Sequence, residues 1–502
     1  MQKLLRFRWM DIVWFVIIVA LAGVVRYGYL HFVIDAPSTT EFAPNSTAPF
    51  LVQGTPNTID PIHLDATVHT KVDVQEARLG TQITDLDLLV YHMNKSDRFA
   101  SIPPLPRNAE TGPIEETAHL APGYPWFCAL LLRFGINLIL VQAVLGAITA
   151  GLYYAFARIA FRNMVVSVLA GLLCALHPFW IVNTGEIADG VLTSFLLGVC
   201  LVLGVAAQRS GHFLVGLLYG VALAGLSLVR AIMLPFSLVG LLWLLGRCRA
   251  ERKTWLCPLL AVLGFVNGLA LWSVRNYQVF DKEIVPISTG TYLHVWMGNN
   301  PNATGVSMSF AEIEQTLTTE RVEVLQQMPQ SKRFDELAHD AVEYVRTHPT
   351  ETVKNRIRTT GYFFFGKAWF TGETDNPASD QNGTSTSQDD PEVNAVWSWV
   401  HGNSPLIVHS MLLGMLALGF LGWRWTHGPH TQTGLAALAL VWIPLPYILS
   451  HAENYFGPRI PLDGILLTFG AFAIGCLIPG LRGKLFDNTA EVKKLDERLL
   501  GT

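Results

Sequence analysis

The sequence predicts an α-helical polytopic membrane protein, a bundle of about ten transmembrane helices with two extracytoplasmic soluble regions. Of the 502 residues, 51% are hydrophobic and only 15% are charged, whereas a typical soluble protein has about 25% charged residues. The apolar residues also recur in blocks of about twenty, the length that a helix needs to cross about 30 Å of hydrocarbon. Such a chain cannot cover itself with polar surface, so we expect membrane lipids around it.

The overall charge argues against nucleic acid as a partner. The formal net charge is −4, the pI is about 6.4, and no basic run dominates the chain. Proteins that bind nucleic acid carry a basic patch or stripe, and this sequence has none of that kind.

The first predicted span, residues 12–33, follows a short basic segment like that of a signal peptide. It is too long for a signal peptide and no small-residue cleavage site follows it, so we interpret it as a retained helix. A shorter apolar block, 124–134, cannot cross the membrane and is expected to re-enter it or to lie in the interface. The other predicted spans are 136–157, 164–182, 189–207, 212–229, 231–246, 255–273, 405–423, 433–450 and 462–480.

Basic residues near the span ends predict the orientation, because cytoplasmic connections carry an excess of Lys and Arg. With the N-terminus in the cytoplasm, most of these residues, including Arg158, Arg162 and Arg209, fall on the cytoplasmic side. Both termini are then cytoplasmic. The predicted parts are the N-terminus with the first transmembrane helix (1–33), a first extracytoplasmic loop (34–122), a transmembrane bundle (123–275), a second extracytoplasmic region (276–403), C-terminal transmembrane helices (404–480) and a cytoplasmic tail (481–502).

The second extracytoplasmic region is expected to contain some regular structure. A strand-like run covers Glu283–Ile287, an amphipathic helical pattern follows around 310–348, and a loop rich in Gly, Ser, Asp and Asn occupies 371–391. The six cysteines all lie in or at the edge of apolar segments, so neither polar region is held by disulfides. This absence, and that of a retention signal, favours a bacterial inner membrane with the active site facing the periplasm over the endoplasmic reticulum.

The segment from Thr84 to His92 is the most informative part of the first loop. Thr84 can cap a helix, and Asp87 and Tyr91 then share one face of it. Asp85 and Asp87 have two interpretations. They could complement the positive end of the helix, or one of them could act as a general base, because a carboxylate near lipid has a raised proton affinity.

A rigid Pro-Gly-Tyr-Pro turn, residues 122–125, leads from the first loop into the short apolar block. Just before it, Glu116 and His119 could bind a divalent metal ion, although a single E-x-x-H pattern is weak support for one. The metal dependence therefore stays open. The turn is expected to be a hinge between loop and membrane whatever else it does.

Polar residues also gather at the outer ends of several predicted spans. Ionisable groups at membrane depth are costly and usually face a cavity or a partner, although snorkelling to the interface explains any one of them. Several on one side favour a single outward-facing active site, and arginines there would suit an anionic phosphate. These residues are His177, Glu186, Asp189, Arg230, Arg275, Asn276, His451, Glu453 and Arg459.

Three motifs in the second half of the chain then occur in order: Trp272-x-x-Arg275-Asn276-Tyr277, Ser288-Thr289-Gly290, and Gly298-Asn299-Asn300-Pro301-x-Ala303-Thr304-Gly305. Together with Asp87-x-x-x-Tyr91, the Pro-Gly-Tyr-Pro turn and Arg459-x-Pro461, they resemble bacterial relatives of dolichyl-phosphate-mannose protein mannosyltransferases. These enzymes belong to the GT-C superfamily, which also includes lipid A aminoarabinose transferases. The chain departs from the family at Leu88, where relatives often have a second acid.

The resemblance implies an inverting glycosyltransferase that moves a hexosyl or pentosyl group from a polyprenyl-phosphate donor to a lipid, protein or glycan acceptor. It implies that Asp87 is the general base and that Tyr91 shapes its pocket, with Asp85 as a substitute for the missing second acid. Asp189 corresponds to an acid that relatives often hold at an outer span end. The resemblance further makes Arg275 and Arg459 ligands of the donor phosphate, with Arg230 as a third, and no cofactor beyond a divalent metal ion. The remaining predicted substrate-binding residues are Glu116, His119, Tyr124 and Asn276.

Two other functions fit the same composition. A ligase or polymerase would move whole oligosaccharides from a pyrophosphate-linked lipid and would need a wider site. A lipid or solute transporter or flippase would favour inverted repeats and helices broken at mid-membrane. No repeat is visible in the sequence, and its polar residues gather on one side instead.

Overall fold

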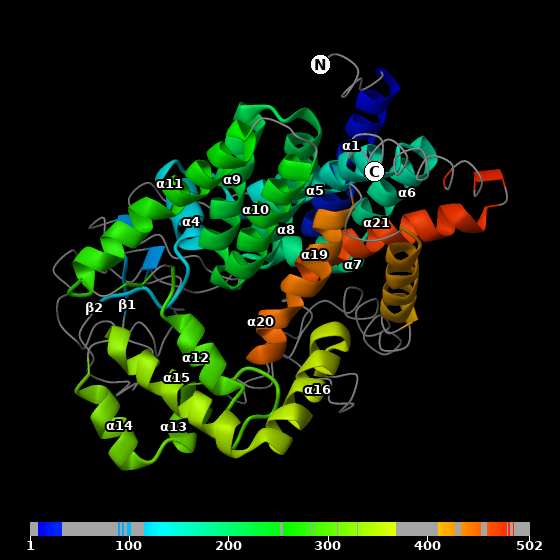
Figure 1. The fold of residues 1–502 in the computed structure, drawn as a ribbon. Coiled ribbons are helices and arrows are strands. Elements are labelled where there is room, and N and C mark those ends of the chain that lie inside the picture. The colour runs from blue at the N-terminus through cyan, green and yellow to red at the C-terminus, as the bar shows by residue number, and fades with distance from the viewer. Residues whose placement is uncertain are drawn as a thin grey trace.

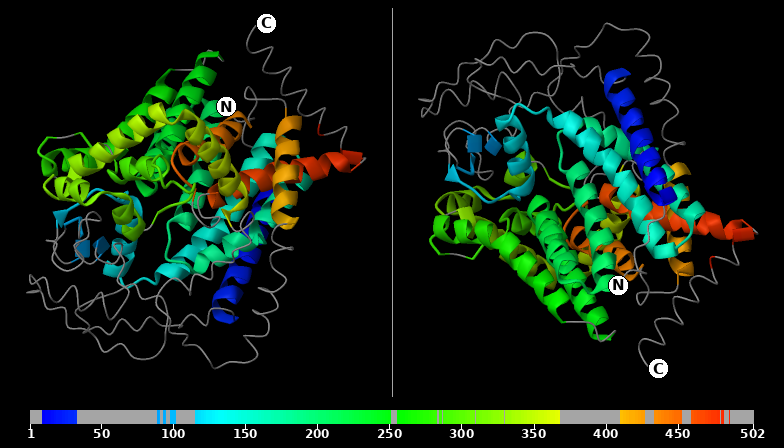
Figure 2. Two further views of the ribbon diagram at one scale, coloured as in Figure 1. Left: turned by 90° about the horizontal axis from the view of Figure 1, so that it is seen from below. Right: turned by 90° about the horizontal axis from the view of Figure 1, so that it is seen from above.

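The structure is a computed structural model. It describes residues 9–32, 89–90, 93–94, 98–101, 115–250, 255–282, 284–285, 287–308, 310–328, 330–367, 410–426, 433–452, 459–478, 480–481 and 485. Within these ranges the regular secondary structure is helical apart from two short paired strands, β1 (Ala100–Ser101) and β2 (Glu115–Glu116), and an isolated bridge between Val306 and Ala452. Figures 1 and 2 show the helices from three directions.

The prediction of an α-helical polytopic membrane protein is confirmed. Six described helices are long and apolar enough to cross a membrane. A seventh span results if α6 (Met164–Ala175) and the segment Pro178–Gly185, which begins with α7 (Pro178–Val182), count as one span bent by 49°. Shorter apolar helices occupy Phe213–Val229 and Gly434–Leu449, and residues 410–425 are also helical. The count of ten spans stays a prediction. The predicted short block is the helix α4 (Gly123–Arg133), too short to cross, as expected.

The centre of the bundle is formed by helices that lie far apart in the sequence. α1 (Trp9–Phe32) packs on α5 (Leu138–Phe161) and α6 (Met164–Ala175), while α8 (Gly190–Ser210) and α21 (Ile460–Leu477) close the other side. Large aromatic side chains fill the space between them; the fully buried ones include Tyr153, Tyr154, Phe156, Phe469 and Phe472.

A second layer of the bundle depends on small residues. The backbones of α9 (Phe213–Val229) and α11 (Leu256–Val279) approach so closely that a Cβ atom on Gly220 would lie 1.9 Å from the carbonyl oxygen of Ala261. A Cβ atom on Gly216 would likewise lie 2.2 Å from the carbonyl oxygen of Cys257. Helices in lipid associate through such close packing, because burial of apolar surface gives little advantage there. Beside them lies α10 (Leu234–Ala250).

Charged side chains at one end of the bundle agree with the predicted cytoplasmic side. Arg158, near the end of α5, forms a salt bridge of 2.6 Å with Asp11 at the start of α1. Arg209, near the end of α8, donates a hydrogen bond of 2.7 Å to the carbonyl of Ile159. Residues predicted to share the cytoplasmic side are therefore together in the structure.

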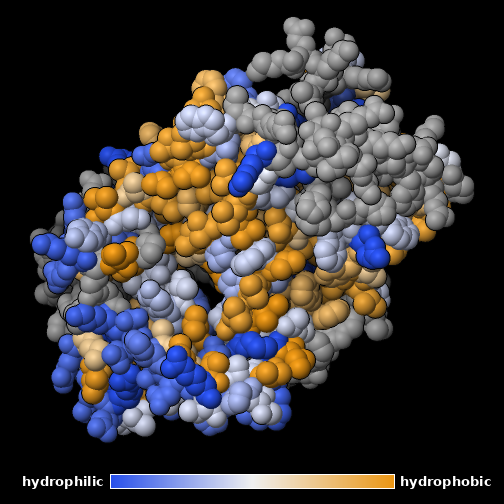
Figure 3. Space-filling view, in the orientation of Figure 1, coloured by the Kyte–Doolittle hydropathy of each residue, from blue (hydrophilic) through white to orange (hydrophobic). Residues whose placement is uncertain are grey.

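The polar helices of the second region predicted to be extracytoplasmic lie against the opposite end of the bundle (Figure 1), which we call its outer end after that prediction. They are α12 (Gly290–Met297), α13 (Phe310–Thr316), α14 (Thr319–Gln326), α15 (Gln330–Thr347) and α16 (Pro349–Phe365). Their own apolar core includes Trp296, Phe334 and Leu337. In Figure 3 a broad hydrophobic face covers the bundle, hydrophilic residues cover these outer helices, and a hollow lies between the two.

Two expectations for this region need adjustment. The amphipathic pattern around 310–348 forms three helices, because Thr318 caps a new helix by accepting from the backbone N–H of Arg321. The predicted strand at 283–287 is wrong for its described residues 284, 285 and 287, which form no strand. Side chains of α11 take their carbonyl groups instead: Asn276 donates to Val285 and Trp272 to Ile287. The loop 371–391 lies outside the described residues.

Two further described helices precede the last span, α19 (Gly434–Trp442) and α20 (Pro444–Leu449). α20 packs on α16 and α19 on α10, so this pair joins the outer helices to the bundle. It contributes Tyr447 and the segment 450–452 to the site described below.

We expect Gly220→Ala to lower the stability of the protein by about 1–3 kcal/mol, because the new methyl group must push the backbones of α9 and α11 apart. Gly225→Ala, on the same helix, is the matched control, since its nearest neighbour would lie at an ordinary 3.9 Å. Thermal unfolding of both variants in detergent tests this. Equal melting temperatures for the two would contradict the close packing of α9 and α11.

Candidate active site at the outer end of the bundle

The predicted base and its neighbours, Asp85, Asp87 and Tyr91, lie outside the described residues. Their roles remain predictions. Glu453 also lies outside the described residues. The other predicted site residues are described, and all but His451 fall into three groups at the outer end of the bundle.

The first group is centred on Asp189 and Arg230. Asp189 precedes α8, and Arg230 lies between α9 and the short 3-10 helix η2 (Ala231–Met233). The guanidinium of Arg230 holds both carboxylate oxygens of Asp189, with Nε donating to Oδ2 at 2.6 Å and Nη2 to Oδ1. Nη1 donates to the hydroxyl of Tyr447 at 3.1 Å. Two predicted residues are thus brought together as a bidentate pair.

Tyr124 lies near this pair and depends on the Pro-Gly-Tyr-Pro turn. A Cβ atom on Gly123 would lie 2.7 Å from the backbone nitrogen of Val229, so only glycine lets α4 pack against the end of α9. The hydroxyl of Tyr124 then donates to the side chain of Gln142 at 3.0 Å. Gln142 in turn donates to the carbonyls of Thr184 and Glu186, at 3.1 and 2.8 Å.

Sequence reasoning missed Gln142, although a fully buried glutamine inside a predicted span is the kind of signal that could have found it. Its amide joins α4, α5 and the 3-10 helix η1 (Asn183–Gly185). The carboxylate of Glu186 accepts a hydrogen bond of 3.0 Å from the side-chain amide of Asn183, so a second contact holds the segment around η1.

The second group joins the two outer regions. Arg275, on α11, donates to the carbonyls of Thr117 and Phe99, at 2.8 and 3.0 Å, and lies 3.4 Å from a carboxylate oxygen of Glu116. Its guanidinium also lies over the ring of Trp272, 4.9 Å from the centroid. The neighbouring Asn276 is fully buried, and its side-chain amide donates a hydrogen bond of 3.0 Å to the carbonyl of Val285.

The Ser288-Thr289-Gly290 motif completes this joint. Thr289 donates its backbone N–H to Ala118 at 2.9 Å, and the hydroxyl of Ser288 donates to the carbonyl of His119 at 2.5 Å. A Cβ atom on Gly290 would lie 2.3 Å from that same carbonyl oxygen. The motif therefore holds the second outer region against residues 117–119.

Glu116 and His119 were predicted as a possible pair of metal ligands. Glu116 also accepts from Arg98 at 3.0 Å, and Nδ1 of His119 lies 2.9 Å from the hydroxyl of Thr117. Within the described part of the chain, no group of three or more His, Cys, Asp or Glu side chains could hold a metal ion.

The third group contains Arg459 and His177. Arg459 is fully buried and holds Asp463, one helical turn further along α21, with Nε at 2.9 Å from Oδ1 and Nη2 at 3.3 Å from Oδ2. Nη1 donates to the carbonyl of Phe364 at 2.8 Å, and Nε2 of His177 lies 2.9 Å from Oδ2 of Asp463, the oxygen that Nη2 of Arg459 also contacts. Sequence reasoning missed Asp463, although its i,i+4 spacing from Arg459 is a known signal.

All three arginines predicted as phosphate ligands therefore have protein partners. Arg230 and Arg459 each present the pair Nε and Nη2 to a carboxylate, and Arg275 bonds to two carbonyls and an acid. No contact with a phosphate follows from these bonds, and none is excluded by them.

A pair of histidines lies where the outer region meets α20. Nδ1 of His451 lies 2.9 Å from its neighbouring carbonyl, Ala452, so this nitrogen carries the proton and Nε2 accepts. Nδ1 of His294, on α12, must then donate to it, at 2.8 Å. The surrounding protein and the rings of His451 and His119 lower the pKa of His294, and because this residue is exposed to solvent the shift is smaller than full burial would cause. Burial also lowers the pKa of His451, which is 4% exposed.

Arg356 and the Gly298-Asn299-Asn300 motif hold the same junction. Arg356 donates to the carbonyls of Gly298 and Ser450, at 2.6 and 3.0 Å, and to the side chain of Asn299 at 2.7 Å. A Cβ atom on Gly298 would lie 1.5 Å from the carbonyl oxygen of Ser450. Only glycine at this position therefore lets the end of α12 pack against the segment after α20.

Comparison with known proteins supports the resemblance seen in the motifs. The family model described as dolichyl-phosphate-mannose-protein mannosyltransferase matches residues 119–272. This range contains the Pro-Gly-Tyr-Pro turn, Gln142, Asp189 and Arg230 and ends at Trp272. No curated protein sequence matches the chain.

One solved structure similar to the chain is the archaeal oligosaccharyltransferase AglB from Archaeoglobus fulgidus, in complex with an inhibitory peptide and a dolichol-phosphate. The TM-score is 0.47 and the sequence identity is 12%. The alignment covers 98% of this chain but 55% of that one, so the chain spans about half the length of AglB.

We expect the stability of the folded protein to fall as the pH drops below about 6.5. The pKa values of His294 and His451 are lower in the folded protein than in the unfolded chain. At a pH between the folded and the unfolded pKa, the unfolded chain therefore binds more protons than the folded protein. Stability then rises with pH through that range and is lost in acid. Thermal unfolding between about pH 7.5 and pH 5 measures the slope.

The double variant His294→Gln/His451→Gln should show a shallower pH dependence than the wild type. His348→Gln, at an exposed histidine of the same region, should retain the wild-type slope. If the double variant and the wild type lose stability in parallel, the histidine pair does not titrate with folding.

Proposed function

We propose that the protein is an inverting membrane glycosyltransferase of the GT-C type. It takes a hexosyl or pentosyl group from a polyprenyl-phosphate donor and passes it to a lipid, protein or glycan acceptor at the outer face of the membrane. The observation that carries the proposal is the match of the mannosyltransferase family over residues 119–272, because this stretch contains the polar cluster around Asp189 and Arg230.

The arrangement of apolar and polar surface is compatible with a lipid-linked donor. The hydrophobic face of the bundle suits a polyprenyl chain, and the hydrophilic outer helices suit a water-soluble acceptor or its head group (Figure 3). The described polar groups at the outer end of the bundle lie between these two surfaces. A donor with its tail in lipid would bring its sugar to that level.

In the proposed mechanism Asp87 removes the proton of the acceptor hydroxyl or amine as it attacks the anomeric carbon. The bond from that carbon to the phosphate oxygen breaks, and the phosphate leaves on the lipid. Fixed positive charge stabilises the negative charge that develops on the phosphate. Tyr91 and Asp85 shape the pocket of the base, and Asp189 with Arg230 forms its opposite wall.

Other predicted residues have supporting roles in this proposal. Arg275 and Asn276 keep the first and second outer regions together over the site, and Tyr124 fixes the entry to the bundle. The parts 34–122 and 276–403 are assigned to the outer side, and 1–33, 123–275 and 404–480 contain the membrane helices. We place the protein in a bacterial inner membrane with the site facing the periplasm.

We expect membranes of cells that make the wild-type protein to be depleted in one polyprenyl-phosphate sugar, and Asp87→Asn to restore that lipid. Loss of a general base lowers a rate by about 10²–10⁴-fold, which is enough to abolish the depletion. Mass spectrometry of extracted lipids measures each donor and identifies the sugar by its mass.

Asp85→Asn is the matched control, because it removes a carboxylate two positions away. It should deplete the lipid more than Asp87→Asn does. If no polyprenyl-phosphate sugar responds to the wild-type protein, the proposed function fails. If Asp87→Asn depletes the lipid as fast as the wild type, the function stands and another group is the base.

A further inference from the structure

Arg26 lies within the first apolar span, where sequence analysis assigned no function. It is fully buried in α1, six residues before the end of the helix. Its Nη1 donates to the carbonyls of Ala22 and Ala175, at 3.1 and 3.2 Å. Its Nε and Nη2 have no hydrogen-bond partner among the residues that the structure describes. A guanidinium stays charged in proteins, so two buried charged donors are left over.

The two donors of Arg26 without a partner, Nε and Nη2, are the same atoms with which Arg230 and Arg459 bind carboxylates. Nε and Nη2 lie side by side on the guanidinium and form a fork that matches two oxygens of one anion. In Arg230 this fork holds Asp189, and in Arg459 it holds Asp463. No described carboxylate forms an ion pair with Arg26. The fork of Arg26 is therefore complementary to an oxyanion that the described residues do not provide.

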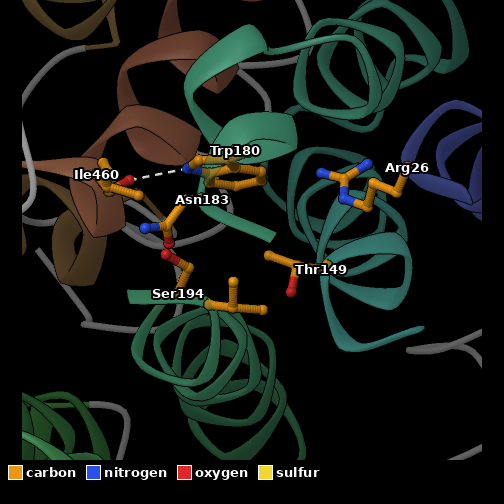
Figure 4. A pocket seen from close by; sticks show the side chains of 8 residues that line it. Arg26, Thr149, Trp180, Asn183, Ser194 and Ile460 are labelled. Carbon is orange, nitrogen blue, oxygen red and sulfur yellow. Dashed lines mark hydrogen bonds between the residues drawn. The ribbon is translucent and has the colours of Figure 1, made fainter. Parts of the chain in front are cut away.

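Arg26 lines a small cavity between six helical segments, α1, α5, α7, η1, α8 and α21 (Figure 4). The cavity lies towards the outer side of the bundle, since Asn183 belongs to η1, Ser194 to the first turns of α8, and Ile460 begins α21. Figure 4 shows the Arg26 side chain reaching from α1 towards Trp180, with Thr149 near its guanidinium. The free space is about that of one water molecule, so it excludes a lipid tail, and a phosphate could place an oxygen there only with the rest of the head group outside the cavity.

The other polar atoms around the cavity limit which ligand could bind there. The hydroxyls of Thr149 and Ser194 donate to the carbonyls of Leu145 and Gly190 within their own helices, so neither proton is available for an anion. The buried Oδ1 of Asn183 has no donor among the described residues. The site thus combines a charged donor fork with an orphan acceptor, and a ligand that satisfies both needs an anionic group beside a hydroxyl.

We infer that Arg26 binds the phosphate of the lipid-linked donor, with a hydroxyl of the adjoining sugar donating to Asn183. This inference rests on the proposed function and names the arginine that its phosphate contact requires. Phosphate oxygens fill the fork that carboxylates fill in Arg230 and Arg459. A sugar phosphate also supplies the hydroxyl that Asn183 can accept.

Gly146 makes a test possible that leaves the arginine in place. A Cβ atom on Gly146 would lie 2.6 Å from Nε of Arg26 and 3.2 Å from its Cδ. Gly146→Ala therefore displaces the end of a flexible side chain rather than a backbone. The matched control is Gly23→Ala, on α1 itself, because its nearest neighbour would be Ala147 Cβ at an ordinary 3.9 Å.

The experiment measures binding of undecaprenyl phosphate, undecaprenol and inorganic phosphate to the full-length protein in lipid nanodiscs, by native mass spectrometry. We expect the wild type to prefer undecaprenyl phosphate to undecaprenol and to bind inorganic phosphate weakly. Arg26→Gln should lose about tenfold or more of that affinity, because charge-assisted hydrogen bonds are the strong ones. Arg26→Lys should keep part of it, since lysine has the charge but not the fork. Gly146→Ala should weaken binding while Gly23→Ala does not.

Thermal unfolding identifies any variant that has lost its fold, and Gly146→Ala then carries the test without removing Arg26. Equal affinity of the wild type, Arg26→Gln and Gly146→Ala for undecaprenyl phosphate would overturn the inference. Equal preference for inorganic phosphate and the lipid would also overturn it, because the site would then bind free phosphate. Binding that depends on Arg26 without any sugar transfer would sustain the phosphate site and refute the proposed function instead.

Discussion

The structure depends on one constraint: inside a bundle of helices surrounded by lipid, every charge and every backbone polar group needs a partner from the protein itself. At the outer end this constraint is met by carboxylates that fill the side-on fork of an arginine. Asp463 holds Arg459 and His177, which ties α21 to the turn before α7 (Pro178–Val182). Asp189 holds Arg230, which also contacts Tyr447, and so ties α8, the end of α9 and α20 together. Removing one partner of the fully buried pair Arg459 and Asp463 would leave a buried charge alone, which is far costlier than the pair is stabilising.

The motifs that resemble those of the mannosyltransferase family also hold the two outer regions in place. Trp272, Arg275 and Asn276 hold the backbone of both outer regions. Gly290 and Gly298 are glycines because carbonyl oxygens of His119 and Ser450 occupy the space of a side chain. Most of these contacts are to backbone groups, so their geometry does not depend on the neighbouring side chains. These sequence signatures therefore mark the joints that fix the outer regions over the end of the bundle, where the proposed reaction takes place.

The sequence was enough to predict the helices but not the choice of partners. Apolar length predicted the spans and the short helix α4, because crossing a bilayer requires a fixed number of residues. The strand at 283–287 failed because side chains of α11 took its carbonyls, a long-range effect that no local pattern contains. Arg459 was predicted as a phosphate ligand, and that stays a prediction, but its partner Asp463 was not found from the sequence. Arg26 escaped notice since one arginine does not interrupt an apolar block, and only the packing of α1, α5 and α6 shows that its fork is open.

The position of Arg26 on α1 connects the proposed phosphate site with the predicted base. The chain runs directly from α1 into the loop that carries Asp87, so the phosphate contact and the base belong to consecutive segments. α1 is fixed at its inner end by the pair of Asp11 and Arg158 and near its outer end by the bonds of Arg26 to Ala22 and Ala175. A helix held at both levels keeps its guanidinium at a constant depth, so in the proposed site the phosphate of a bound donor would lie at a fixed level. Among the described residues, Arg230 and Arg459 use this fork to join helices, whereas in Arg26 the same two donors are available to the proposed phosphate.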